Sequence, residues 1–231
     1  MLYDCRTTAD RDRGIAAAVE AVKSGELVVM PTDTVYGVGA DAFTPHAITA
    51  LHHARSAPSQ VPPPVLIGSR HTLDGLVFSL PRAARELADA FWPGALTLYV
   101  EHSASLQWDL GDTGGQIAVR MPLHPVALEV LREVGPMAVT TANKVGRPAP
   151  VTAEEAREQL EYAVRVYLEA GAAADDAPRG PGSSAPSTIV DVTGDVPRIL
   201  RAGAIPFEKL RDVVPDIVPL ESGPDVGGTE A

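Results

Sequence analysis

Leu27-Val-Val-Met-Pro-Thr-Asp-Thr-Val-Tyr-Gly-Val-Gly-Ala-Asp41 joins an apolar run to a polar, glycine-containing segment. Its first four residues are apolar without interruption, which is typical of a central strand covered on both faces. Pro31 cannot donate to a sheet ladder and should end that strand. Three hydroxyls and a carboxylate follow within positions 32–36, and Gly37 and Gly39 permit close backbone approach or positive φ. We expect a tight polar loop where open α/β sheets bind ligands; the alternative is a turn with internally satisfied hydroxyls.

The rest of the chain alternates between helix and strand patterns. Helices are expected at 10–24, 45–55, 81–91, 125–134, 152–160 and 206–213. Further strands are expected at 65–67, 96–100, 117–121, 137–141, 164–168, 188–192 and 199–200. This alternation predicts an α/β layer fold, and several connections are too short for helical crossovers, so the sheet should be mixed.

The segments between these helices and strands indicate the loops and the expected domain limits. The prolines of 56–64 predict an extended loop. Residues 175–186 are rich in Gly, Pro, Ser and Asp and are interpreted as a mobile loop or lid. We expect a single domain over residues 1–213 and a flexible tail over 214–231.

Composition narrows the class of protein. The chain has 231 residues and a net charge of −11, which weakens the case for direct RNA binding by counterion release. It has one cysteine, Cys5, so no internal disulfide can form, and no Cys/His cluster has the spacing of a zinc site. Neither a signal peptide nor a membrane-spanning apolar run is expected, and the expected location is the cytoplasm.

Several common catalytic motifs are missing, and the remaining candidates are polar residues at strand ends. The sequence contains no P-loop, no complete Gly-x-Gly-x-x-Gly and no Gly-x-Ser-x-Gly elbow. Arg120 lies in an apolar strand, where it would either form an internal salt bridge or clamp a carboxylate or phosphate. Thr141 and Asn143 end another strand and would bind an anion or ribose, or form an Asx-turn. Ser187 and Arg201 flank further strands.

Taken in order, these segments resemble the YrdC/Sua5 family over residues 10–213. The resemblance implies a twisted mixed β-sheet flanked by helices, with a concave ligand cavity. It also implies synthesis of L-threonylcarbamoyladenylate from ATP, L-threonine and bicarbonate, the activated donor for t6A at position 37 of tRNA. The matching segments are Pro31-Thr-Asp-Thr-Val-Tyr-Gly, Phe91-Trp-Pro-Gly-Ala-Leu-Thr, Ala118-Val-Arg-Met-Pro, Thr141-Ala-Asn143, Ser187-Thr-Ile-Val-Asp191 and Leu200-Arg-Ala-Gly.

Carried over residue by residue, the resemblance assigns roles at two neighbouring sites. The threonine substrate would be bound by Thr32, Tyr36, Arg120 and Ser187. The nucleotide would be bound by Arg55, Thr141, Asn143 and Arg201, with Arg55 as the catalytic cation. Mg²⁺ would accompany ATP and shield its phosphates, with no metal held by protein ligands alone. Proteins of the t6A pathway would be partners, and no membrane is involved.

The chain departs from the family at its Lys-x-Arg motif. Ungapped spacing from Thr32 places Arg55 at the lysine position and Ala57 at the arginine position. A two-residue shift would instead align His53-Ala-Arg55, but it would displace the strand at 65–67. Losing a charge-assisted contact to phosphate costs on the order of 1.5–3 kcal/mol. Smaller departures are Gly68-Ser69 in place of a histidine, Gln116 in place of a threonine, and Thr141 in a Ser-x-Asn motif.

Three hypotheses follow from the resemblance and its departures. The first is a threonylcarbamoyl-AMP synthase with an altered basic motif. The second is a catalytically impaired paralogue that binds a nucleotide or carbamoyl-adenylate as a regulatory or interaction module. The third is a carbamoyl-adenylate enzyme with a different amine acceptor, against which Thr32 and Arg120 favour threonine.

Overall fold

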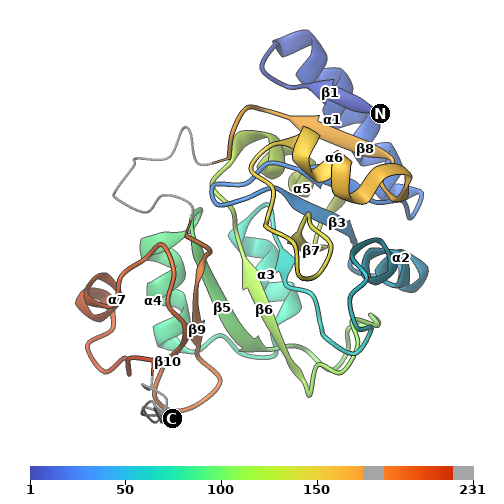
Figure 1. Cartoon of the computed structure of the whole chain (residues 1–231). Helices are drawn as coiled ribbons and strands as arrows, with labels where there is room; N and C mark the ends of the chain where they lie inside the picture. The colour runs from blue at the N-terminus through green and yellow to red at the C-terminus, as the bar shows by residue number, and fades with distance from the viewer. Residues whose placement is uncertain (174–184, 221–231) are drawn as a thin grey trace, which may run out of the picture.

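The computed structural model describes residues 1–173 and 185–220, and these residues form an α/β fold around one mixed sheet (Figure 1). The strands are β1 (Leu2–Asp4), β2 (Val28–Met30), β3 (Gly37–Asp41), β4 (Val65–Leu66), β5 (Leu96–Glu101), β6 (Gln116–Arg120), β7 (Met137–Thr141), β8 (Val166–Glu169), β9 (Thr188–Asp191) and β10 (Arg198–Arg201). The helices are α1 (Thr8–Lys23), α2 (Pro45–Arg55), α3 (Arg70–Leu76), α4 (Arg82–Phe91), α5 (Pro125–Val134), α6 (Ala153–Leu160) and α7 (Phe207–Val213), with a 3₁₀ turn at Glu161–Ala163.

The strand order confirms a mixed sheet. It runs β1-β8-β2-β3-β7-β4-β6-β5-β9-β10. Neighbours are parallel in β1/β8, β2/β8, β4/β6 and β5/β9. They are antiparallel in β2/β3, β3/β7, β4/β7, β5/β6 and β9/β10.

The sheet is covered on both faces, as the apolar start of the opening stretch predicts. Val28 and Met30 pack on one side with α1 and α5, whereas Val29 packs on the other side in the larger core. Side chains alternate along a strand, so this split follows from an uninterrupted apolar run. At the far end of the sheet α4 and α7 lie together beside β9 and β10 (Figure 1).

The expected loop after β2 is shorter than the sequence suggested. Gly37–Asp41 forms β3, which pairs with β2 and β7, so the connecting loop covers only residues 31–36. The glycines are needed for close approach, not for positive φ. A Cβ at Gly37 would lie 2.7 Å from Cγ1 of Val139, and one at Gly39 would lie 2.8 Å from its Cγ2. Two further elements were not predicted, the edge strand β1 and the short helix α3.

The fold also extends past the predicted domain limit at residue 213. Val214 and Ile217 are buried, and the backbone of Val218 hydrogen-bonds to Pro197 and Ile199 beside β10. Residues 214–220 therefore belong to the packed structure and not to a tail. The remainder of the predicted tail, and residues 175–184 of the predicted lid, lie outside the described residues.

Candidate functional site

One face of the central strands forms the floor of a cavity of about 250 Å³. Partners in a β ladder point to the same face, so the register places a row of side chains side by side. Gly37 pairs with Thr141, Leu66 pairs with Arg120, and Thr97 pairs with Ile189. Each of these six residues lines the cavity. Segments far apart in the chain thus meet on one surface.

The loop at 31–36 closes one wall of this cavity. Oγ1 of Thr32 accepts from the backbone N–H of Thr34 and of Val35, both at 3.2 Å, and donates to the carbonyl of Val35 at 2.6 Å. The Thr32 side chain is buried and lines the cavity. The Thr32 hydroxyl is therefore satisfied within the turn, which was the alternative interpretation of this loop. The same residue also lines the cavity, as expected of a ligand-binding loop.

Arg120 is held on three sides within the cavity wall. Its Nη2 forms an ion pair with Oδ1 of Asp33 at 2.5 Å, its Nη1 donates to Oγ1 of Thr34 at 3.0 Å, and its Nε donates to the carbonyl of Gly94 at 3.0 Å. Burial lowers the pKa of Arg120 while Asp33 opposes that shift. The internal salt bridge considered for Arg120 is therefore present, and the guanidinium still lines the cavity.

Ser187 and Arg201 close the opposite wall. Nη2 of Arg201 donates to the carbonyl of Ser187 at 2.8 Å and to its Oγ at 3.0 Å. Burial lowers the pKa of Arg201, and the positive charge of Arg120 lowers it further. The two guanidiniums therefore act on the same small volume, which suits an anionic ligand.

Arg55 lines a second, adjoining cavity of about 200 Å³ and contacts Thr141, which lines the first. Both cavities are lined by Pro64 and Thr140. Nη2 of Arg55 donates to Oγ1 of Thr141 at 3.1 Å, and its Nε donates to the carbonyl of Asn143 at 3.0 Å. Burial lowers the pKa of Arg55. Thus Arg55 both lines the second cavity and ties α2 to the segment after β7.

Two predicted site residues lie outside the linings of these cavities. Asn143 donates from Nδ2 to the carbonyls of Lys144 at 3.0 Å and Arg147 at 2.8 Å, so its amide organises the loop after β7. Among the described residues its Oδ1 has no hydrogen-bond partner. Asn143 therefore reaches the second cavity only through Arg55, which donates to its carbonyl.

Tyr36 does not line either cavity, which corrects its expected place in the threonine pocket. Its ring is fully buried, and its hydroxyl donates to the carbonyl of Gly171 at 2.7 Å and lies 3.1 Å from Oε1 of Glu169. Burial is the main cause of its raised pKa. Tyr36 precedes Gly37, which faces the cavity, so alternation sends the tyrosine to the other face of the sheet.

Some cavity residues were missed by sequence reasoning. Thr97 is 3% exposed and lies 2.8 Å from Oγ of Ser187. Its signal was a lone hydroxyl between the buried residues Leu96 and Leu98. Thr34 lies within the opening stretch, but its contact with Arg120 depends on a loop conformation that the local sequence does not show.

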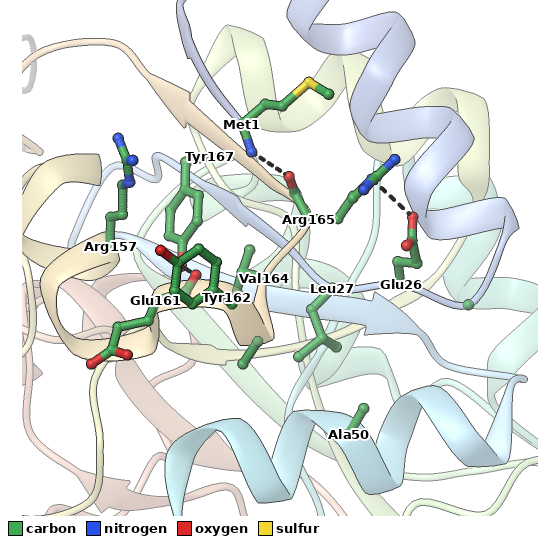
Figure 2. Close-up of a pocket in the computed structure, with 12 residues that line it drawn as sticks. Met1, Glu26, Leu27, Ala50, Arg157, Glu161, Tyr162, Val164, Arg165 and Tyr167 are labelled. Carbon is green, nitrogen blue, oxygen red and sulfur yellow. Dashed lines mark hydrogen bonds and ion pairs between the residues drawn. The ribbon is translucent and has the colours of Figure 1, made fainter.

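A larger cavity of about 680 Å³ lies at the opposite end of β2 (Figure 2). Its lining includes Leu27 before β2, Ala50 on α2, Arg157 on α6, and Tyr162 and Arg165 shortly before β8. Figure 2 shows Arg165 directed toward Glu26, at 3.5 Å in an exposed ion pair. None of the predicted site residues lines this cavity, so size does not identify the site here.

The described residues contain no cluster of three or more His, Cys, Asp or Glu side chains that would hold a metal ion. Asp33, in the loop that closes one wall of the first cavity, is already paired with Arg120. No helix in the described part of the chain is both long and apolar enough to cross a bilayer.

Comparison with known proteins identifies the family. A family model described as telomere recombination, for Sua5/YciO/YrdC proteins, matches residues 20–203. A Mycobacterium tuberculosis protein provisionally named as a threonylcarbamoyl-AMP synthase is 55% identical, across 92% of this chain and 94% of its own length. The threonylcarbamoyl-AMP synthase of Bacillus subtilis is 35% identical, across 88% of this chain and 57% of its own length.

Solved structures agree with this grouping. The crystal structure of Sua5 from Pyrococcus abyssi complexed with L-threonine has a TM-score of 0.84 and 31% identity, and the match covers 95% of this chain but 62% of that one. Escherichia coli YciO has a TM-score of 0.76 at 23% identity, which shows a shared fold alone. This chain thus spans less than two thirds of the Pyrococcus protein. With the model match over residues 20–203 and the 55% identical relative, the chain belongs to the Sua5/YciO/YrdC family.

Proposed function

We propose that this chain is an L-threonylcarbamoyladenylate synthase, which converts ATP, L-threonine and bicarbonate to threonylcarbamoyl-AMP and pyrophosphate. One observation carries the proposal: Thr32, Arg120, Ser187 and Arg201, from four separate segments, line a single cavity of about 250 Å³. Two guanidiniums and several hydroxyls in this volume suit a small zwitterion that bears a carboxylate. The names of the relatives support the same activity.

The reaction asks for positioning and charge neutralisation more than for a protein nucleophile. The amine of threonine and bicarbonate give a carbamate and release water, and a carbamate oxygen then attacks the α-phosphorus of ATP while pyrophosphate leaves. Such a transfer is accelerated mainly by alignment of the reactants and by cations near the phosphates. The chain would then act as a nucleotidyltransferase without a covalent enzyme intermediate.

The two cavities divide the substrates between them in this proposal. Threonine occupies the cavity of Arg120 and Ser187, and its carboxylate lies against the guanidiniums. The nucleotide extends from the first cavity, which Thr141 and Arg201 line, toward the adjoining cavity, which Arg55 lines. The shared lining by Pro64 and Thr140 supports contact between the two substrates.

Mg²⁺ enters this proposal as part of the ATP substrate. The described residues offer no metal-binding cluster, so the protein alone does not fit a resident Mg²⁺. ATP would bring the ion on its phosphate oxygens, since Mg²⁺ in such sites is bound largely by substrate phosphates. The product would serve t6A formation in tRNA together with other proteins of that pathway.

Pyrophosphate release tests this function directly. The purified protein is incubated with ATP, Mg²⁺, threonine and bicarbonate, and release is compared with a reaction without threonine. We expect threonine-dependent release that falls strongly in Arg201→Met but not in Arg211→Met, an exposed arginine outside both cavities. If release does not depend on threonine while calorimetry still detects ATP binding, the synthase assignment is wrong.

A second candidate function is a catalytically impaired paralogue that binds nucleotide or carbamoyl-adenylate. The observation in its favour is Ala57, which lines the second cavity at the arginine position of the altered Lys-x-Arg motif. A methyl group there supplies no charge to a phosphate. ATP binding without any turnover, in the assay above, would support this candidate.

A further inference from the structure

Thr97 carries a buried hydroxyl near the start of β5. It is 3% exposed, and its neighbours Leu96 and Leu98 are fully buried. β5 pairs Leu98 with Val119, so Thr97 lies next to Arg120 on the cavity face. On its other side β5 runs parallel to β9, which brings Oγ1 of Thr97 within 2.8 Å of Oγ of Ser187. Thr97 thus sits between the two walls of the cavity.

The hydroxyl of Ser187 is bound from two directions. Nη2 of Arg201 lies 3.0 Å from it and must be the donor, because a guanidinium has no acceptor. Thr97 takes a second bonding position at 2.8 Å, either as donor or as acceptor. A hydroxyl offers one hydrogen and two lone pairs, so one position of Ser187 remains. The contacts with Arg201 and Thr97 therefore determine the direction in which the remaining hydrogen-bonding site of the Ser187 hydroxyl points.

We propose that Thr97 is a positioning residue that sets the direction of the Ser187 hydroxyl, and with it the binding of the amino-acid substrate. This inference rests on the proposed synthase function. Thr97 acts through Ser187, and Arg201 completes the chain of contacts. Removing the Thr97 hydroxyl leaves the Ser187 hydroxyl held by Arg201 but not by Thr97, so its direction is less fixed when the substrate binds. The effect falls mainly on threonine binding, because Ser187 is assigned to that substrate.

The test compares two substitutions of Thr97, one that removes its hydroxyl and one that removes its methyl group. Thr97→Val removes the hydroxyl and keeps the shape, whereas Thr97→Ser keeps the hydroxyl and removes the methyl group. For Thr97→Val we expect KM for threonine to rise about 3- to 10-fold, the range of one net hydrogen bond, with KM for ATP and kcat changed less than twofold. Thr97→Ser should stay within about twofold of wild type. The matched control is Thr188→Val, an equally buried hydroxyl that bonds Ile205 and lines neither cavity.

The outcomes separate the inference from the function it rests on. An active wild type with an unchanged threonine KM in Thr97→Val overturns the inference and leaves the function intact. Equal losses in Thr97→Val and Thr97→Ser also overturn it, since packing would then be the cause. Without threonine-dependent turnover in the wild type the proposed function fails. In that case crystal structures of wild type and Thr97→Val decide, because an unmoved Ser187 hydroxyl contradicts the positioning role.

Discussion

Arg120 and Asp33 form an ion pair beneath the candidate threonine site, with Nη2 of Arg120 2.5 Å from Oδ1 of Asp33 and side-chain exposures of 8% and 7%. Oδ1 of Asp33 also accepts from the backbone N–H of Leu123 at 2.9 Å. The pair therefore joins the loop after β2 to the segment after β6. Removing one member of a buried pair leaves an uncompensated charge, which costs more than the pair contributes when intact.

Asp33→Asn should therefore destabilise the protein strongly. We expect the free energy of unfolding in urea to fall by about 3–5 kcal/mol, because the Arg120 charge stays buried without its partner. Arg120→Met in the Asp33→Asn background should restore part of this loss, which makes the two substitutions non-additive. Asp12→Asn, at an exposed carboxylate, is the control. Purely additive effects would show that the ion pair does not couple the two segments.

Gly37 should not tolerate a side chain while Val139 is present. A Cβ at Gly37 would lie 2.7 Å from Cγ1 of Val139, closer than normal van der Waals contact. We expect Gly37→Ala to lower the free energy of unfolding by about 1–3 kcal/mol through overpacking. Combining it with Val139→Ala should cost less than the sum of the two single changes. An additive double variant would contradict this packing explanation.

His52 should make stability depend on pH in the mildly acidic range. Its pKa is lowered from 6.5 by burial, then by the charges of Arg55 and His53. The unfolded chain therefore binds a proton more readily than the folded protein. The contribution of His52 is fully present above about pH 6.5 and is lost as pH falls through the folded pKa. Urea unfolding from pH 7.5 to 5 should show a shallower decline for His52→Leu than for wild type.

The neighbouring exposed histidine provides the control for this slope. His53→Gln should retain most of the wild-type decline, because His53 is exposed and His52 is buried. Equal slopes for wild type, His52→Leu and His53→Gln would assign the pH dependence to other groups.

Restoring the basic motif should raise the rate of the proposed reaction. In Arg55→Lys/Ala57→Arg the new guanidinium would enter the second cavity, which Ala57 lines. A charge-assisted contact made in the transition state would raise kcat by roughly tenfold to a hundredfold. Single variants at each position, measured by pyrophosphate release, show which change is responsible. A rate equal to or below that of wild type would mean that the Lys-x-Arg motif is not aligned with Arg55 and Ala57, or that the motif does not limit the rate.

The sequence predicted most elements because their local signals agree with the tertiary structure. α2 and α5 begin and end as predicted, at Pro45–Arg55 and Pro125–Val134, since proline at the first helical position and apolar periodicity point the same way. β3 was interpreted as part of a loop because Gly37 and Gly39 permit close backbone approach or positive φ. Its reason for being there, the approach of Val139, is a contact across more than a hundred residues.

The sequence predicted which residues line the site better than it predicted where their side chains point. Thr32, Arg120, Ser187 and Arg201 do converge on one cavity. Tyr36 was placed there by the family resemblance, yet the onset of β3 turns it to the opposite face. Local sequence does not show on which side of a turn the strand alternation resumes.

The central claim is that this cavity joins threonine, bicarbonate and the adenylyl group of ATP. The most direct measurement uses ¹³C-bicarbonate with ATP, Mg²⁺ and threonine, and follows the products by mass spectrometry. The account predicts threonylcarbamoyl-AMP carrying one ¹³C, formed together with pyrophosphate and absent when threonine is omitted. ATP that binds but yields no labelled adenylate, or a labelled adenylate whose formation does not need threonine, would contradict it.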